Sequence, residues 1–120
     1  MANIINLETF KDDRGSLSVI EKILPFEIKR IYFIYNVCGV RGGHGHLRTI
    51  QGLISVHGSC EIIVKGAKKE ERFALDSPDK CLLLQPEDWH QMQNFTNDCV
   101  LLVIASEYFD SEDYIPKVVS

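Results

Sequence analysis

The sequence predicts an all-β protein, a β-sandwich or barrel built as a single domain over residues 1–120. Two observations predict the fold class. Short runs of β-branched, aromatic and apolar residues recur at regular spacing with turn-forming residues between them, and helical periodicity is almost absent. A chain of 120 residues has room for one hydrophobic core and not for a second.

The expected strands follow one another along the chain. They cover residues 4–10, 17–21, 28–35, 44–56, 60–64, 71–75, 81–84, 89–95 and 99–105. Glycine, proline, asparagine, aspartate and serine mark the turns, including those at 12–16, 65–68 and 76–79. Residues 111–114 favour a short helical turn. In the strand at 28–35, Arg30 and Tyr32 share one face, whereas Tyr35 lies on the other.

Composition and charge exclude several classes of protein. The chain is 45% hydrophobic and 25% charged, as is typical of a soluble domain, and its net charge of −4 argues against a nucleic-acid partner. It contains no apolar run of about 18 residues and no secretory signal at its start, so we expect no membrane association. The four cysteines form no Cys-x-x-Cys pair, which favours a reduced, cytoplasmic chain.

Two histidines, two positions apart, are the strongest functional signal. In residues 41–46, His44 and His46 flank Gly45 and follow Gly43. Side chains two apart on a strand point to the same face, so a barrel interior would place both imidazoles in one pocket. Glycine has no Cβ, and we therefore expect Gly43 and Gly45 to make that pocket roomy.

The spacing from His44 onward resembles the two signature motifs of the cupin superfamily, which are small β-barrels of the jelly-roll type. The first motif pairs His-x-His with a glutamate and a later glycine; here Gln51 takes the glutamate position and Gly58 follows. The second motif has proline, glycine, histidine and asparagine; the matching residues are Pro86, Asp88, His90 and Asn94, with Asp88 replacing the glycine. This resemblance implies a cupin-type jelly-roll barrel.

Metal-binding cupins hold a divalent ion at the positions that are His44, His46, Gln51 and His90 in this sequence. Three imidazoles suit zinc, iron or manganese, but a neutral amide contributes no charge to offset the ion. We therefore expect no metal and no other cofactor. His90 is then a wall of the pocket beside Trp89, and Gln51 a hydrogen-bond donor that holds an imidazole in one tautomer.

A narrower resemblance covers nearly the whole chain. It rests on residues 13–17, 28–32, 41–46, 58–60, 89–90 and 105–115, in that order. The chain resembles the sugar 3,4-ketoisomerase family of cupins, which convert dTDP-4-oxo-6-deoxy-glucose into its 3-oxo isomer as homodimers without metal. Their product feeds into 3-amino-3,6-dideoxy sugars of bacterial surface polysaccharides. The sequence departs from the family at Gly43, Gly45 and Leu47.

The chemistry implied by this resemblance needs a base at C3 of the sugar and a stabilised enediolate. Imidazole suits the task because its pKa of about 6.5 lies near neutral pH. We expect His44 and His46 to be this acid/base pair, without assigning the carbon proton to one of them. Tyr32 is the expected hydroxyl donor to the sugar or enediolate.

The nucleotide diphosphate calls for guanidinium groups, which form paired, charge-assisted hydrogen bonds with phosphate. Arg30 is the first candidate because it alternates with Tyr32 on a strand, and Arg14 and Arg41 are the others. The residues that we expect to line the sugar or base site are Trp89, Gln93 and Tyr108.

Three other functions fit the same motifs. A metal-dependent small cupin, such as a dioxygenase, would lose its activity on chelation. A non-catalytic nucleotide-sugar-binding cupin would bind the dTDP-sugar without exchanging its C3 proton. A nucleotide-sugar epimerase would invert carbons rather than move the carbonyl.

Overall fold

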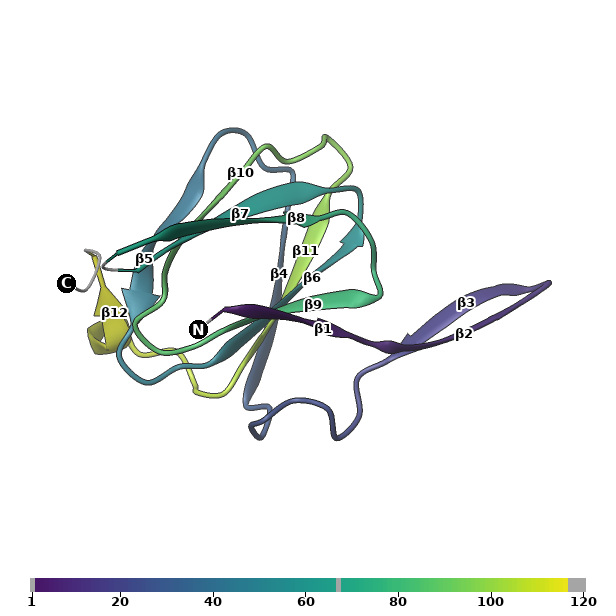
Figure 1. Cartoon of the computed structure of the whole chain (residues 1–120), viewed down its shortest axis with the longest axis horizontal. Coiled ribbons are helices and arrows are strands. Elements are labelled where there is room, and N and C mark those ends of the chain that lie inside the picture. The colour runs from purple at the N-terminus through teal and green to yellow at the C-terminus, as the bar shows by residue number, and fades with distance from the viewer. Residues whose placement is uncertain (1, 67, 117–120) are drawn as a thin grey trace.

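The computed structural model describes residues 2–66 and 68–116 and confirms the all-β jelly roll. Two five-stranded antiparallel sheets face each other (Figure 1), and a two-stranded arm extends from one end. Residue 67 of the expected turn at 65–68 lies outside the described residues, as does the tail beyond Pro116.

The strand order places sequence-distant segments side by side. The first sheet has the order β1 (Asn3–Asn6), β9 (Lys80–Leu84), β6 (Gln51–His57), β11 (Val100–Ala105) and β4 (Arg30–Tyr35). The second has the order β12 (Tyr114–Ile115), β5 (Arg41–His46), β10 (Trp89–Gln93), β7 (Cys60–Lys65) and β8 (Glu70–Leu75). The arm is the hairpin of β2 (Glu8–Asp12) and β3 (Gly15–Val19), and the expected helical turn is η1 (Ser111–Asp113).

Two expected strands are each divided in the structure. The stretch at 4–10 breaks at Leu7, whose backbone N–H donates to Asp79 O at 2.8 Å while Glu8 begins to pair with β3. The stretch at 44–56 breaks after His46, because Leu47 N donates to Asp113 O instead of to a neighbouring strand. Local alternation cannot signal either break, since both partners are remote in sequence.

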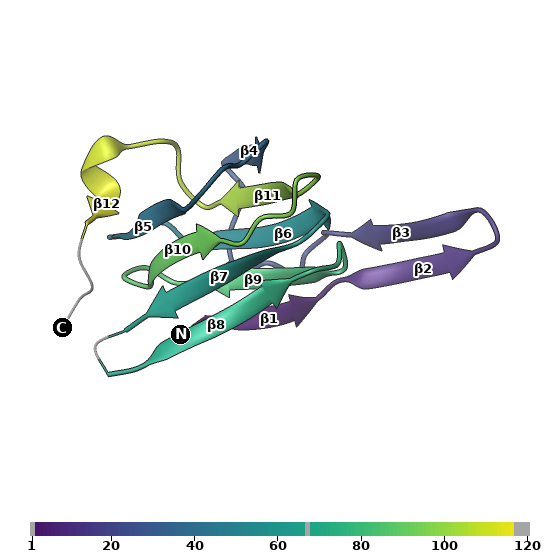
Figure 2. The same cartoon turned by 90° about the horizontal axis from the view of Figure 1, so that it is seen from above.

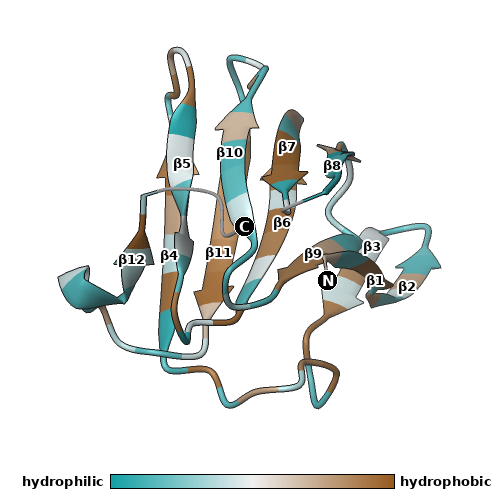
Figure 3. Cartoon of the chain, turned by 60° about the vertical axis from the view of Figure 1, so that its left-hand side comes forward, coloured by the Kyte–Doolittle hydropathy of each residue, from teal (hydrophilic) through white to brown (hydrophobic). Residues whose placement is uncertain are grey.

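The core lies between the two sheets. Fully buried side chains from both sheets meet there, among them Leu53, Ile62, Leu82, Leu101 and Val103. Figure 3 shows the matching hydrophobic colour on β7, β9 and β11. Burial of such side chains is the main favourable contribution to folding, at about 25 cal/mol per Å² of apolar surface.

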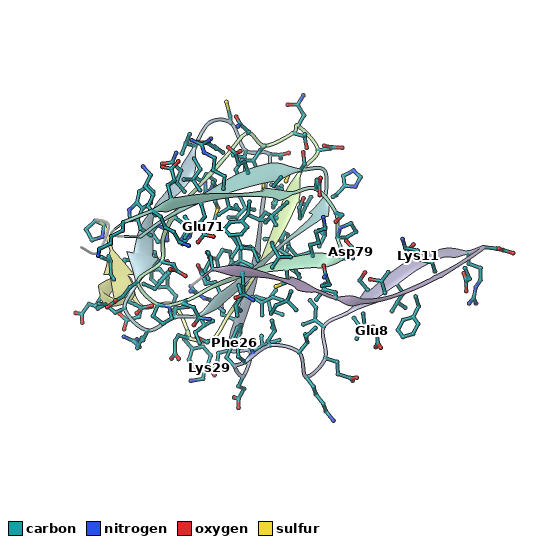
Figure 4. All side chains as sticks on the ribbon, in the orientation of Figure 1. Glu8, Lys11, Phe26, Lys29, Glu71 and Asp79 are labelled. Carbon is teal, nitrogen blue, oxygen red and sulfur yellow. The ribbon has the colours of Figure 1, made fainter. Side chains whose placement is uncertain are left out.

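The outer face of the first sheet is partly covered by the chain that joins β3 to β4. Leu24 and Phe26 from this connection pack with Ile54, Cys81 and Ile104. Phe26 is labelled at the lower edge of the molecule in Figure 4, next to Lys29.

The arm stands away from both sheets. Figures 1 and 2 show β2 and β3 projecting from the end of the molecule opposite to β12, and Glu8 and Lys11 lie along it in Figure 4. The arm makes the molecule long, with principal extents of 49 × 30 × 26 Å.

The described residues include no helix that is long and apolar enough to cross a membrane. The four cysteines are all free thiols, with Cys38 exposed and the other three buried.

Substitution of Gly58, the glycine of the first motif, tests the packing of the β6–β7 turn. It has φ +69°, and a Cβ there would lie 2.7 Å from the Cα of Cys99. We expect Gly58→Ala to lower the free energy of unfolding by about 2 kcal/mol or more, because backbone strain adds to the clash. Gly66→Ala is the control, since the nearest atom to its Cβ would be 3.9 Å away. Equal urea midpoints for the two variants would contradict this account.

Candidate functional site

A β-bulge on β5 aims the two histidines. In the pairing of β5 with β10, His44 lies opposite His90, and Gly42 lies opposite Gln91, the next residue of β10. Gly43 is therefore an extra residue in β5, and the register shifts by one residue. Gly42 and Gly43 both have positive φ, +83° and +82°, as a bulged strand requires. Bulges of this kind redirect side chains, and here the bulge directly precedes His44.

Three imidazole rings and one phenol ring come together on the inner face of this sheet. The His44 ring centroid lies 5.1 Å from those of His46 and His90, and the Tyr114 ring lies 4.7 Å from both His44 and His46. The expectation that His44 and His46 share one environment is confirmed. His90 joins them because β10 neighbours β5, and Tyr114 because β12 pairs with the other edge of β5.

A cavity of about 390 Å³ opens beside this cluster, between β4 and β5. Its walls are Arg30, Tyr32, Ile34, Arg41, Gly42, His44, Met92, Phe109 and Tyr114. His44 therefore faces the cavity, whereas His46 is buried behind it. Four of the predicted site residues, Arg30, Tyr32, Arg41 and His44, meet in this one space.

Hydrogen bonds orient the phenol of Tyr32. Gln51 Nε2 donates to its hydroxyl oxygen at 3.0 Å, which leaves the phenol O–H free to donate elsewhere. Burial raises the pKa of Tyr32, and the Arg30 charge opposes this only in part, so the hydroxyl keeps its proton at neutral pH. Gln51 thus donates its hydrogen bond to Tyr32, whereas the sequence predicted an imidazole as its partner.

Arg30 is held between two aromatic rings. Its guanidinium carbon lies 5.2 Å from the Tyr32 ring centroid and 5.7 Å from that of Phe109. Its Nε is buried and has no hydrogen-bond partner within residues 2–66 and 68–116. Cation–π contacts fix the plane of this group at the cavity wall and leave a donor unused.

The three imidazoles are held as neutral rings. Burial lowers the pKa of each, most strongly for His90, where it falls to about 3. A hydrogen bond to protein oxygen commits one nitrogen of two of these rings: His46 Nδ1 to Asp113 Oδ2 at 3.1 Å, and His90 Nδ1 to the Asp88 carbonyl at 3.3 Å. Each of these two rings then retains a lone pair on its other nitrogen.

Asp113, Tyr114 and Phe109 were not among the predicted site residues. All three come from the segment that follows β11 and returns along β5. The sequence marked residues 111–114 as a helical turn but contained no local signal for their contact with β5.

The metal-binding arrangement of other cupins does not fit these residues. No group of three or more histidine, cysteine, aspartate or glutamate side chains within the described part of the chain is placed to hold a metal ion. The fourth position is Gln51, whose neutral amide, unlike a carboxylate, contributes no charge to offset a divalent ion.

Six predicted binding residues do not line the cavity: Gln51 and His90 are buried, and four others lie away from it. Trp89 and Gln93 alternate with the buried His90 and Met92 on β10, so they point to the opposite face, where Gln93 donates to Glu61 at 2.8 Å. Tyr108 is exposed and stacks with the Lys29 ammonium. The Arg14 side chain is 89% exposed at the tip of the arm and pairs with Asp12.

The two glycines beside the histidines do not enlarge the cavity. A Cβ on Gly45 would meet the backbone of Asp88 and Trp89, and one on Gly43 would face the Trp89 ring at 3.8 Å. The expectation of a roomier pocket is therefore wrong. These glycines allow β5 to bulge and to approach β10 closely.

Comparisons with known proteins agree on one family. The profile of the FdtA family (WxcM-like, C-terminal) matches residues 1–119. A TDP-4-oxo-6-deoxy-alpha-D-glucose-3,4-oxoisomerase of Aneurinibacillus thermoaerophilus is 42% identical over 116 residues, which are 93% of this chain and 84% of that protein.

Solved structures show the same relationship. A 3,4-ketoisomerase from Helicobacter canadensis superposes with a TM-score of 0.92 at 38% identity, covering 97% of this chain and 90% of the other. A variant of the 3,4-ketoisomerase QdtA from Thermoanaerobacterium thermosaccharolyticum, in complex with TDP-4-keto-6-deoxyglucose, gives 0.93 at 40% identity and covers 97% and 87%.

The low pKa of His90 predicts an acid-sensitive fold. A buried neutral imidazole takes up its proton only after unfolding, so the free energy of unfolding falls as pH drops from about 6.5 toward 3. One such group contributes a slope of about 1.4 kcal/mol per pH unit. We expect His90→Gln to reduce the slope of the unfolding free energy against pH, measured by urea unfolding between pH 5 and 6, by up to this amount.

The control for this measurement is His57→Gln, because the His57 side chain is 69% exposed. We expect it to leave the slope unchanged. A His90→Gln variant with the same slope as the parent protein would show that His90 is not held neutral by burial.

Proposed function

Because the chain belongs to the FdtA family (WxcM-like, C-terminal), we propose that it is an isomerase that moves the carbonyl of a dTDP-4-oxo-6-deoxy-hexose from C4 to C3. The single observation behind this proposal is the cavity that joins a neutral imidazole, a phenol and two guanidinium groups. Its product would serve the synthesis of 3-amino-3,6-dideoxy sugars for surface polysaccharide.

The reaction moves hydrogens only. A base takes the proton from C3, which the adjacent C4 carbonyl makes acidic, and the electron pair forms a C3–C4 double bond with negative charge on the C4 oxygen. The C3 hydroxyl then gives up its proton and the C4 oxygen takes one, and a proton adds to C4, which leaves the carbonyl at C3 and a hydroxyl at C4. No oxidant or reductant enters, so a base, an acid and an oxyanion donor suffice.

His44 is the base in this proposal. Its ring forms part of the cavity wall, whereas His46 is buried behind it. Burial lowers the pKa of His44, and the neighbouring His46 lowers it further, so its ring is neutral and able to accept a proton at pH 7. His46 acts behind His44 as the second member of the acid/base pair.

Tyr32 donates to the developing oxyanion. Its protonated phenol accepts from Gln51 and so directs its O–H toward another acceptor. An alkoxide or enediolate oxygen in the cavity is such an acceptor, and a preformed donor stabilises it without reorganisation. His90 completes the polar inner wall as a neutral acceptor.

Arg30 and Arg41 bind the nucleotide diphosphate. Both line the cavity, and the Nε of Arg30 is an unused buried donor. Paired N–H donors match phosphate oxygens better than a single ammonium does.

A second copy of the chain is the further partner that we propose. The outward face of the edge strand β4 exposes Ile31, Phe33 and Tyr35, and the two rings stack at a centroid distance of 5.8 Å. The arm exposes another apolar pair, Phe10 opposite Leu17. Two such surfaces on one chain can be covered by a symmetric dimer in which each arm lies on the other copy.

The dimer also gives Arg14 a role. This residue lies in the turn between β2 and β3, and the arm that these strands form points away from β5 (Figure 1), so Arg14 can serve a site only in the other copy. Trp89, Gln93 and Tyr108 remain proposed as outer contacts for the nucleotide or the partner. We place the enzyme in the cytoplasm, in keeping with its free thiols, and without a nucleic-acid or membrane partner.

The test of the proposed reaction is proton NMR of the product formed from dTDP-4-oxo-6-deoxy-glucose in deuterated water. We expect the 3-oxo isomer, and we expect His44→Asn to reduce turnover by about 10²–10⁴-fold because it removes the base. His57→Asn, on the surface, is the matched control.

Four results would contradict the proposal. Wild-type exchange in both His44→Asn and His46→Asn would remove the histidines from the chemistry. A 4-oxo product inverted at carbon would indicate an epimerase, and binding without exchange a carrier of nucleotide sugars. Activity that is lost on chelation and restored by iron would indicate a metal-dependent cupin.

Sedimentation velocity tests the dimer. We expect the protein to sediment at twice the 13.7 kDa of one chain, and Phe33→Glu to shift it toward the monomer by placing a charge in the contact. Val40→Glu is the control, since Val40 is 61% exposed, close to the 60% of Phe33, but lies outside the β4 face. A monomeric parent protein, or a Phe33→Glu variant that stays dimeric, would refute this interface.

A further inference from the structure

The segment after β11 forms a strap across the outer edge of β5. We call residues 110–116 the strap. Asp110 begins it by accepting the Glu112 N–H on its side chain and the Asp113 N–H on its backbone oxygen, which closes the short η1 turn. β12 then pairs with β5, placing Tyr114 opposite His46 (Figure 1).

The strap buries one carboxylate, that of Asp113. Its Oδ1 accepts the backbone N–H of Arg48 at 2.9 Å, and its Oδ2 accepts the hydroxyl of Thr49 and lies 3.1 Å from His46 Nδ1. Burial alone would raise the pKa of Asp113, but these hydrogen bonds hold it below its usual value. Asp113 is therefore an ionised group in the interior, with each oxygen in use.

This geometry determines the protonation pattern of His46. An ionised carboxylate only accepts hydrogen bonds, so the contact at 3.1 Å requires a hydrogen on His46 Nδ1. A neutral ring with its hydrogen on Nδ1 has a lone pair on Nε2. That Nε2 is buried beside the His44 and Tyr114 rings and has no protein partner within residues 2–66 and 68–116.

His46 differs in this respect from the other two rings. His90 donates to the backbone carbonyl of Asp88, and neither His90 nor His44 pairs with a carboxylate within residues 2–66 and 68–116. A carboxylate stabilises an imidazolium far more than a carbonyl dipole does, because it carries a full opposite charge. Among the three rings, His46 is the one whose surroundings tolerate a proton during turnover.

We propose that Asp113 is a positioning residue that fixes His46 as the Nδ1–H tautomer and stabilises the histidine pair while it holds the substrate proton. This inference rests on the proposed isomerase function. It assigns to the strap, and not only to the sheet, a part in the reaction.

Asp113→Asn is the informative variant because it keeps the shape of the side chain. The amide oxygen can still accept from Arg48 N, which turns the amide NH₂ toward His46 and requires that ring to carry its hydrogen on Nε2 instead. Long-range ¹H–¹⁵N NMR of the imidazole rings reads this tautomer directly. We expect Nδ1–H in the parent protein and Nε2–H in Asp113→Asn.

Turnover should fall in the Asp113→Asn variant, in which the tautomer of His46 changes. We expect kcat of Asp113→Asn to drop on the order of 10²–10⁴-fold, and KM to stay within about threefold because Asp113 does not line the cavity. Asp110→Asn is the matched control, since Asp110 belongs to the same strap and pairs with Arg48 without touching His46. It should keep the parent tautomer and kcat.

The outcomes separate this inference from the proposed function. A parent protein with His46 as Nε2–H overturns the inference without any variant, as does an Asp113→Asn variant that changes tautomer but keeps its kcat. An Nδ1–H ring that changes tautomer as expected, in a protein that does not isomerise the sugar, overturns the proposed function while the tautomer assignment stands.

Discussion

The position of β5 between two strands is the constraint on which the site depends. On one side β10 places His90 opposite His44, and on the other β12 places Tyr114 opposite His46. The bulge at Gly42–Gly43 turns both histidines inward, and the glycines let the backbones approach without a side chain between them. The cluster would lose His90 without β10 and Tyr114 without β12.

Burial and charge oppose each other across this cluster. Removing three imidazoles from water keeps them neutral, which suits a base but works against holding a proton. Asp113 counters that effect at His46 alone, through a direct contact from the strap. The site thus combines rings that stay neutral with one ring, His46, whose protonated form is stabilised by a carboxylate. This combination suits the transfer of a proton between neighbouring carbons.

Part of this site could be predicted from local pattern. Alternation on β4 correctly separated Arg30 and Tyr32 from Tyr35, and the two-residue spacing placed His44 with His46. The same alternation on β10 puts Trp89 and Gln93 on the face opposite His90, outside the cavity. The division of the stretch at 44–56 escaped prediction, because its cause is a bond to Asp113.

Other features depend on contacts that no local pattern contains. Asp113 reaches His46 across 67 positions of sequence, and a short helical turn says nothing about what it will pack against. The arm projects away from both sheets, and alternation along β2 and β3 does not indicate what the turn with Arg14 contacts. Gly43 and Gly45 were interpreted as space for a ligand, whereas they accommodate the neighbouring strand.

The central claim is that a base in this cavity removes the hydrogen at C3 of a 4-oxo sugar. Turnover of dTDP-4-oxo-6-deoxy-glucose deuterated at C3 tests it most directly, by following the label with NMR. The account predicts that the deuterium passes from C3 to the solvent, with a primary isotope effect that reports C–H cleavage. A 3-oxo product that carries all of the deuterium at C4 would contradict it, because the label would then have moved directly between the two carbons.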